Sequence, residues 1–265
     1  MTLLLPGLYV SVSSPVHRLD PRVKMAAALL LMLAPFAAPS LPSSVLLTAF
    51  IALVAHFSSA PWKALLRTLR TVLWLGFFLF VFYLFTTPGR ALLSWRGIRL
   101  TAEGVVIGSR QIFRLCFLVI LSTLLTFTTS PAQLTHGMEA LLGPLARLGL
   151  PVREAAMVLS ISLRFVPTLF DQVDRIIKAQ RSRGAALRSG PPWSRLRSWM
   201  PVFVPIFVAA FRRADELAVA MDARGFRGVH RRTHLHQLRL GWADLLASLI
   251  VLGVGAAALT LDRLF

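Results

Sequence analysis

The stretch Thr71–Thr87, with the sequence TVLWLGFFLFVFYLFTT, contains no charged residue and is rich in aromatic side chains. A helix of this length and composition nearly crosses the ~30 Å hydrocarbon core of a bilayer. Four further apolar stretches of similar length lie before and after it: Val23 to Ala38, Pro42 to Ala60, Leu115 to Thr129 and Trp242 to Leu261. We therefore predict an all-α polytopic membrane protein with about five transmembrane helices.

The composition supports this fold class and excludes an ordinary water-soluble domain. Of the 265 residues, 56% are hydrophobic and 15% are charged, whereas soluble domains carry about 25% charged residues. The 29 Lys and Arg residues outnumber the 11 acids and give a net charge of +18. A nucleic-acid-binding protein has no need of long uncharged stretches. We therefore attribute the positive charge to cytoplasmic loops of a membrane protein and expect no nucleic-acid partner.

Several kinds of site are not expected in this chain. The single cysteine, Cys116, cannot form a disulfide or a multi-cysteine metal site within one chain. The sequence contains no Gly-x-x-x-x-Gly-Lys loop and no Gly-x-Ser-x-Gly turn, so we predict neither an ATP site nor a hydrolase nucleophile of those kinds. The stretch Met1–Val16 has no Lys or Arg and no small-residue cleavage site after it, so we do not interpret it as a signal peptide.

The segment between the fourth and fifth apolar stretches, residues 131–240, differs from the rest of the chain. It contains 17 of the 29 basic residues and 7 of the 11 acids, and it has no uncharged stretch of spanning length. Because Arg-rich segments stay on the cytoplasmic side, we predict transmembrane helices in 1–130, a cytoplasmic domain in 131–240 and a C-terminal transmembrane helix in 241–265, with a cytoplasmic N-terminus. Five arginines oppose this orientation by falling near the external side: Arg90, Arg96, Arg99, Arg110 and Arg114.

Two long amphipathic helices are predicted in the cytoplasmic domain. In the first, apolar residues recur at steps of three and four from Val152 to Ile177, and Pro167 is expected to bend the helix. In the second, an apolar face runs from Phe203 to Met221. Two such helices in tandem are expected to pack on each other or on a partner.

The two predicted helices end alike, in Ser182-Arg183-Gly184 and in Ala223-Arg224-Gly225. When these ends are superposed, three upstream positions also coincide: Phe170 with Phe211, Asp174 with Asp215, and Ala179 with Ala220. A helix C-cap explains one such ending, because glycine suits the left-handed conformation and arginine complements the helix dipole. Two such endings with matching upstream residues favour a role in addition to helix capping.

An arginine at such an end can bind another protein. Its guanidinium offers five donors in a rigid fork to carboxylates or backbone carbonyls, and the small residue and glycine beside it let a partner surface come close. Two equivalent ends can bind two equivalent partners. The dimer of a nucleotide-hydrolysing motor would present such a pair.

Four groups of residues carry a resemblance to a known family: His17-Arg-Leu-Asp-Pro-Arg22, Leu124-Leu-Thr-Phe-Thr-Thr129, Leu163-Arg-Phe-Val-Pro167 and the two Arg-Gly ends. In these residues and in the order of its elements, nearly the whole chain resembles the transmembrane T component of energy-coupling factor (ECF) transporters, the family of EcfT, CbiQ and BioN. The resemblance implies a non-catalytic transporter subunit in the cytoplasmic membrane of a prokaryote.

The resemblance also implies partners. In that family the two small-Arg-Gly motifs end cytoplasmic coupling helices, which dock into grooves of two ABC-type ATPase subunits, and the T component also holds a substrate-binding S component. ATP-driven closing of the ATPases moves the coupling helices, topples the S component and delivers a vitamin or a metal ion such as cobalt or nickel.

Carried over by position, the coupling residues are Ser182, Arg183, Gly184, Ala223, Arg224 and Gly225. The residues that match the family's structural motifs are His17, Asp20, Pro21, Arg22, Arg164 and Pro167. Ser182 stands where the family usually has alanine, and because both residues are small we expect the same fit.

Other polar groups have simpler explanations. His136 and Glu139 lie three apart on a predicted helix, but no third ligand is near them in sequence, so a solvated helix face is favoured over a metal site. The tract His230–His236 lies among arginines ahead of a membrane span, where contact with anionic headgroups is favoured over metal binding. Arg110 and Arg114 could mark a transport path, but we expect them to reach the outer interface. We predict no metal and no cofactor.

The residues leave two alternative functions open. One is a membrane-embedded enzyme that uses His136, Glu139 and the arginines on a lipid phosphate or pyrophosphate. The absence of clustered carboxylates or histidines in the predicted spans counts against it. The other is a scaffold that anchors cytosolic proteins regardless of nucleotide. The sequence does not identify the transported substrate, because in the family the S component determines it.

Overall fold

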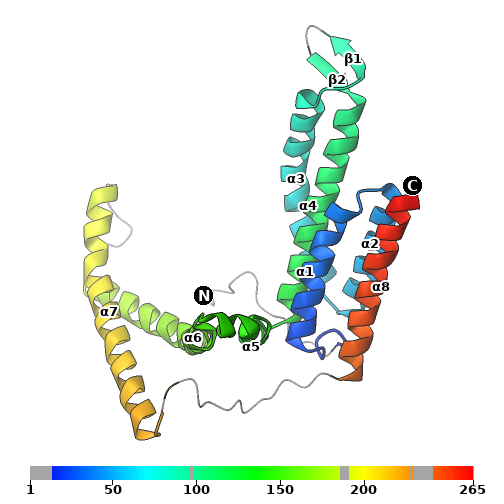
Figure 1. Cartoon of the computed structure of the whole chain (residues 1–265). Coiled ribbons are helices and arrows are strands. Elements are labelled where there is room, and N and C mark those ends of the chain that lie inside the picture. The colour runs from blue at the N-terminus through cyan, green and yellow to red at the C-terminus, as the bar shows by residue number, and fades with distance from the viewer. Residues whose placement is uncertain (1–13, 96–97, 186–190, 227, 229–240, 265) are drawn as a thin grey trace. The chain divides into compact units, whose positions relative to one another are not determined.

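The computed structural model describes residues 14–95, 98–185, 191–226, 228 and 241–264 (Figure 1). The chain forms two compact units. The first contains the residues up to Ala140 and those from Leu238 onward, and the second contains Leu141–Gln237. The second unit thus begins later than residue 131, the predicted start of the cytoplasmic domain.

The described part of the first unit contains six helices and one β-hairpin. The helices are α1 (Pro21–Ala37), α2 (Leu41–Phe57), α3 (Trp62–Thr86), α4 (Ala102–Thr128), most of α5 (Pro131–Leu142) and α8 (Trp242–Leu264). As predicted, Asp20 starts α1: its carboxylate accepts the N–H of Arg22 at 2.9 Å, and Pro21 is the first helical residue.

The helices α3 and α4 lie side by side and are joined by the hairpin of β1 (Ala91–Trp95) and β2 (Ile98–Thr101) (Figure 1). The strands are antiparallel, with Trp95 opposite Ile98. The carboxylate of Glu103, in the first turn of α4, accepts the N–H of Arg90 at 2.7 Å. The Thr101 hydroxyl donates to the carbonyl of Thr87, just after α3, at 2.9 Å. The connection predicted as a hairpin or turn is therefore a hairpin that is bonded to both helices.

The core of the first unit lies where α1, α2, α4 and α8 meet. The helix α8 packs against α1 and α2, and α1 also packs against α4. The buried apolar residues of this core include Leu31, Leu47, Phe117, Leu121 and Ala258. The far end of α8 is bonded to the start of α2. There, the Asp262 carboxylate accepts the N–H of Ser40 at 2.8 Å, and the Ser43 hydroxyl donates to the Ala258 carbonyl at 2.7 Å.

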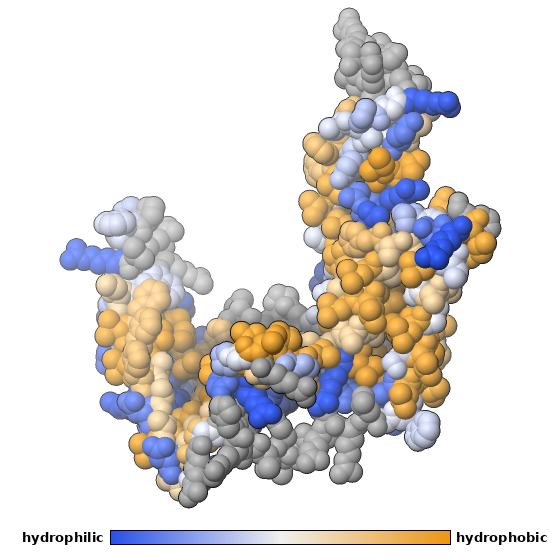
Figure 2. Space-filling model, in the orientation of Figure 1, coloured by the Kyte–Doolittle hydropathy of each residue, from blue (hydrophilic) through white to orange (hydrophobic). Residues whose placement is uncertain are grey.

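Length and composition confirm a polytopic membrane protein. Four helices of the described residues are long and apolar enough to cross a membrane: α3, α4, α8 and α6 (Val152–Ser182). At the other two predicted spans, α1 and α2 have 17 residues each. Apolar side chains cover much of the surface of the first unit (Figure 2), and the Trp74, Phe78 and Phe82 side chains of α3 are more than half exposed. Such a surface suits contact with lipid.

Arg114 makes contacts that the sequence did not predict. Its Nε donates to the carbonyl of Pro35 in α1 at 3.1 Å, and its guanidinium lies over the Phe36 ring at 4.9 Å. The residue four positions after Pro35 is Pro39, which has no N–H for that carbonyl. Arg114 therefore satisfies a carbonyl that the helix itself leaves without a donor, instead of only reaching toward the interface.

The second unit consists of the 3₁₀ turn η1 (Gly143–Leu148), α6 and α7 (Pro192–Ala223). The two long helices pack against each other, and the Arg213 guanidinium of α7 lies over the Phe165 ring of α6 at 5.6 Å. The helix α6 continues through Pro167, and α7 continues through Pro201 and Pro205. The two long helices predicted for this region are thus present, with 31 and 32 residues.

Candidate functional site

The amphipathic character of α6 and α7 leaves apolar side chains at their surfaces. In α7, Phe203, Phe207 and Phe211 recur at steps of four, and their side chains are 44%, 61% and 69% exposed. Apolar residues gather along α7 (Figure 2). In α6, Val166 and Phe170 are also exposed. A helix face of this kind is typical of a surface that packs on another protein or on lipid.

The ends of α6 and α7 have the same backbone geometry. Gly184 and Gly225 adopt the left-handed conformation, with φ of +84° and +73°. In each helix the glycine donates its N–H to the carbonyl three positions back, and the next residue donates to the carbonyl five positions back. The bonds, all of 2.9–3.0 Å, are Gly184 to Arg181 and Ala185 to Gln180 in α6, and Gly225 to Asp222 and Phe226 to Met221 in α7. Both ends are therefore Schellman caps.

Arg183 and Arg224 close these helices, and both are exposed. Within the part of the chain that the structure describes, neither side chain makes a hydrogen bond or an ion pair. A Cβ added to Gly184 or to Gly225 would meet no atom within 4 Å, so the space beside each arginine is open. Backbone bonds form the caps, which leaves both guanidinium groups available to another molecule. Ser182 and Ala223 precede the arginines as the last helical residues.

Alanine in place of either glycine is expected to loosen its helix end. The left-handed conformation disfavours a residue with a Cβ by about 1 kcal/mol, because Cβ approaches the carbonyl oxygen. In Gly184→Ala the amide of Ala185 should exchange its hydrogen severalfold faster, and in Gly225→Ala the amide of Phe226 should do the same. Hydrogen exchange followed by mass spectrometry measures both.

Gly253→Ala is the matched control for these two variants. Gly253 lies inside α8, outside the left-handed region, and a Cβ there would also meet no atom within 4 Å. The Gly253→Ala variant should leave the hydrogen exchange of both capping amides, Ala185 and Phe226, unchanged. Unaltered exchange at Ala185 and Phe226 in their own variants would show that the glycine conformation does not maintain the caps.

The N-terminal motif lies in the first unit, where it joins three helices. The Asp20 backbone N–H donates to the Asp244 carboxylate at the start of α8 at 2.7 Å. The Lys24 ammonium donates to the carbonyls of His17 at 3.0 Å and Thr128, the last residue of α4, at 3.1 Å. The His17 ring is 3.3 Å from the Phe127 carbonyl. The motif therefore fixes the start of α1 against the end of α4 and the start of α8.

Two members of this cluster, Lys24 and Asp244, were not predicted from the sequence as site residues. Both are buried, and Asp244 also accepts the N–H of Gly241 at 2.8 Å. Each is a charged residue at the beginning of a predicted apolar stretch, and a charge in such a place is itself a signal of a polar partner. What the sequence could not supply is the pairing, because Asp20 and Asp244 stand at opposite ends of the chain.

The remaining residues of the family motifs have different surroundings. Arg164 and Pro167 lie on α6 and are exposed, and the Arg164 side chain makes no hydrogen bond to a residue that the structure describes. Arg22 lies in the first turn of α1, and its Nε is buried without an acceptor among the described residues. The structure thus brings His17, Asp20 and Pro21 into one cluster and leaves Arg164 and Pro167 on a separate surface.

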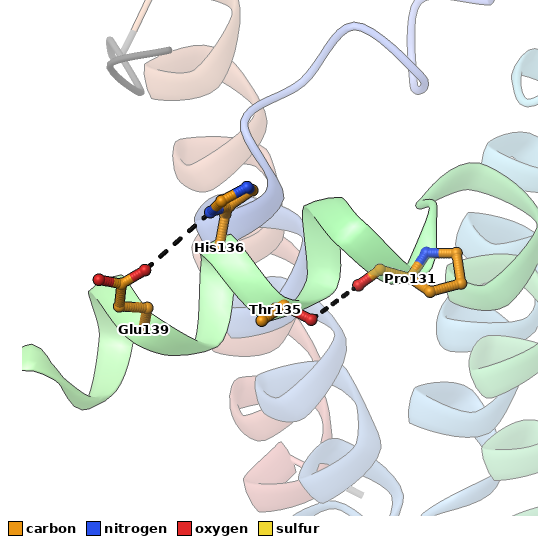
Figure 3. Close-up of polar contacts among 4 residues, drawn as sticks. All are labelled: Pro131, Thr135, His136 and Glu139. Atoms are coloured by element: carbon orange, nitrogen blue, oxygen red, sulfur yellow. Dashed lines mark hydrogen bonds and ion pairs between the residues drawn. The ribbon is translucent and has the colours of Figure 1, made fainter. Parts of the chain in front are cut away.

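His136 and Glu139 lie one turn apart on α5, with His136 Nδ1 4.0 Å from Glu139 Oε2 (Figure 3). The nearby Thr135 hydroxyl donates to the Pro131 carbonyl at 3.0 Å and so is used within the helix. Among the residues described, no group of three or more His, Cys, Asp or Glu side chains is arranged to hold a metal ion. The predicted headgroup-binding tract at residues 230–236 lies outside the described residues.

Comparison with known proteins gives consistent matches over most of the chain. The profile of the cobalt transport protein family CbiQ matches residues 12–235. The energy-coupling factor transporter transmembrane protein EcfT of Acidaminococcus fermentans is 45% identical over 94% of this chain and 92% of its own length. The proteins of the same name from Heliobacterium modesticaldum and Bacillus subtilis are 44% and 40% identical. Those alignments cover 94% and 95% of this chain, and 93% and 96% of the relatives.

Proposed function

Because this chain belongs to the CbiQ family of transport proteins and is a non-catalytic transmembrane component of the EcfT type, we propose that it couples two cytosolic ATPase subunits to a substrate-binding S component. In this proposal ATP hydrolysis by the ATPases moves α6 and α7, and this movement drives the S component to deliver a vitamin or a transition-metal ion such as cobalt or nickel. Since the subunit is non-catalytic, the alternative of an enzyme acting on a lipid phosphate is not retained.

The observation that carries this proposal is the pair of matching helix ends. Each presents an exposed arginine, Arg183 or Arg224, beside a glycine with open space around it. A guanidinium can bind a carboxylate or two backbone carbonyls of a groove in a partner. Two ends with one geometry are suited to two copies of one partner, which is the arrangement of an ATPase dimer. A scaffold would have no need of two identical contacts.

The apolar faces of α6 and α7 support the proposal that an S component is the second partner. Phe203, Phe207 and Phe211 are exposed along one side of α7, and exposed aromatic stripes of this length mark interaction surfaces. We assign this side of the second unit to the S component. The contact would let a motion of the two helices reach a partner that lies in the membrane.

The charge of the second unit supports its placement in the cytoplasm. Residues 131–240 carry ten more basic than acidic side chains, and such segments are retained on the cytoplasmic side. The proposed location is the cytoplasmic membrane of a prokaryote, with the N-terminus and the second unit inside the cell.

Co-purification tests the proposal. The full chain, isolated with an affinity tag from its own host in mild detergent, should bring down two ATPase subunits and one small membrane protein. Native mass spectrometry gives their ratio. The isolated chain should hydrolyse no ATP, and the assembled complex should. Recovery of the chain with one ATPase copy, or with none at any detergent concentration, would contradict the coupling role.

A further inference from the structure

An apolar groove of about 400 Å³ lies within the first unit, between α1, α2, α4 and α8 (Figure 1). Its lining residues on α1 and α4 are buried or half-buried, as Leu31 and Leu121 are. On α2 and α8, lining residues such as Leu53 and Leu246 are more than half exposed. The groove therefore opens to the surface of the unit on the side of α2 and α8.

The groove extends over a similar distance along all four helices. Its lining covers residues 23–31 of α1 and 243–251 of α8, which is about 12 Å at 1.5 Å per residue. It covers two turns of α2 and α4 as well, within residues 50–57 and 121–128. The hydrocarbon of one leaflet of a bilayer is about 15 Å thick. The groove thus has nearly the length of one leaflet, and it begins at the helix ends that the N-terminal motif joins.

The groove presents carbon atoms to an occupant. Among the described residues that line it, the polar ones are Lys24 and Thr128, and both are bonded within the protein. The Lys24 ammonium donates to the carbonyls of His17 and Thr128, and the Thr128 hydroxyl donates to the Leu124 carbonyl at 2.8 Å. Water finds no partners in such a space, and an empty groove forfeits dispersion contacts of its lining. A hydrocarbon occupant is therefore favoured.

The end of the groove at the N-terminal motif carries a positive charge. Arg18 is exposed in the segment 15–19, which contributes lining residues at this end. The carboxylates of Asp20 and Asp244 lie close by, but both residues are buried and accept backbone N–H groups. Their charges also act on the buried Lys24 ammonium. The exposed charge at this end is thus that of Arg18, which favours an anionic group there.

We propose that the apolar groove holds one acyl chain of an anionic phospholipid. The chain lies between α2 and α8 against α1 and α4, and the headgroup lies at the end of the groove where Arg18 is exposed. Hydrocarbon then meets the apolar lining over the depth of one leaflet, and the phosphate stays at the membrane surface beside a positive charge. The site lies entirely within the first unit and does not depend on the coupling role.

Photolabelling of the full chain in vesicles tests the site. The vesicles consist of phosphatidylethanolamine with a trace of phosphatidylglycerol that carries a photoreactive group in the middle of one acyl chain. Lipids that only pass by label residues according to exposure, so Trp74 and Phe78 of α3 would be labelled more than the half-buried Ala27 and Leu125. A bound chain reverses this order. Mass spectrometry should find Ala27 and Leu125 labelled severalfold more than the two aromatic residues, and the opposite order would overturn the proposal.

A phenylalanine at position 247 is expected to fill the groove. Ala247 of α8 lines the groove and is half-buried, so Ala247→Phe should lower the labelling of Leu125 severalfold and leave that of Trp74 unchanged. Ala256→Phe is the matched control, because Ala256 is exposed on the same helix outside the groove. It should be labelled like the wild type. Undiminished labelling of Leu125 in Ala247→Phe, or an equal loss in Ala256→Phe, would contradict an occupied groove.

The headgroup is tested with a phosphatidylcholine probe that carries the same photoreactive chain. One arginine near a membrane surface favours an anionic lipid about fivefold, so the phosphatidylglycerol probe should label Leu125 of the wild type about fivefold more. Arg18→Gln should remove this preference and retain labelling by both probes. Equal labelling of the wild type by the two probes would overturn the assignment to an anionic lipid.

The N-terminal residues of the chain are the competing occupant, because residues 1–13 carry no charge and precede the segment at the end of the groove. Leu4→Gln with Leu5→Gln makes this sequence more polar within the full chain. The labelling of Leu125 should be the same as in the wild type. A severalfold rise would assign the groove to residues 1–13 instead of a lipid.

Discussion

The double variant Arg183→Glu with Arg224→Glu is expected to abolish co-purification of the ATPase subunits. It reverses the charge of the arginines at the C-terminal ends of α6 and α7. Each substitution removes a charge-assisted donor and places a carboxylate opposite the acceptors of the partner. Loss of one side of a buried charged contact costs about 2–5 kcal/mol. Two such losses lower the affinity roughly 1,000-fold or more. Pull-down of the tagged chain followed by quantitative mass spectrometry measures the result.

Arg153→Glu with Arg197→Glu is the matched control for charge and location. One residue lies on α6 and the other on α7, both are exposed, and neither is near a helix end that carries the glycine. This variant should retain its ATPase partners. Hydrogen exchange at the two caps should be unchanged in both double variants, because backbone bonds form the caps. Full ATPase association in the variant with Arg183→Glu and Arg224→Glu would remove the basis for the coupling proposal.

Replacing Asp244 by alanine is expected to destabilise the first unit strongly. The carboxylate accepts two backbone N–H groups, those of Asp20 and Gly241, and its charge acts on the buried Lys24 ammonium. Removing it leaves two donors without an acceptor and a buried cation with less compensation, which costs about 3–5 kcal/mol. For a chain of this size the midpoint of thermal unfolding in detergent should fall by roughly 10 °C.

Two further variants define the cause of that loss. Asp244→Asn keeps an oxygen acceptor and removes the charge, so its unfolding midpoint should fall between those of the wild type and the alanine variant. Asp215→Ala removes an exposed carboxylate of α7 and should change stability by about 0.5 kcal/mol or less. If Asp244→Ala unfolds at the same temperature as Asp215→Ala, the cluster does not hold α1, α4 and α8 together.

Much of the fold could be predicted because its elements depend on local patterns. Apolar stretches indicated α2, α3, α4 and α8, and the Asp20-Pro21 pair indicated where α1 begins. The repeated Arg-Gly ends indicated two helices with equivalent C-caps, and the structure gives both the same hydrogen bonds. In each case the residues that determine the structure are close together in sequence.

The contacts between distant parts of the chain could not be predicted. Asp244 bonds to Asp20 across nearly the whole sequence, and Arg114 of α4 finds the Pro35 carbonyl of α1. Each contact depends on how helices pack, which hydropathy patterns do not specify. Hydropathy also fails to separate α6 from a spanning helix: its length and composition suffice to cross a membrane, although Arg164 lies near its middle. Two other properties, its amphipathic stripe and the excess positive charge of residues 131–240, argue for a surface position.

The caps of α6 and α7 have a consequence for how such subunits diversify. Because main-chain bonds and a glycine define each end, the neighbouring side chains contribute little to its shape. Ser182 and Ala223 already differ at one matched position without altering the turn. Mutation can therefore change the side chains that each end presents, one residue at a time, while both helix ends keep the same backbone conformation.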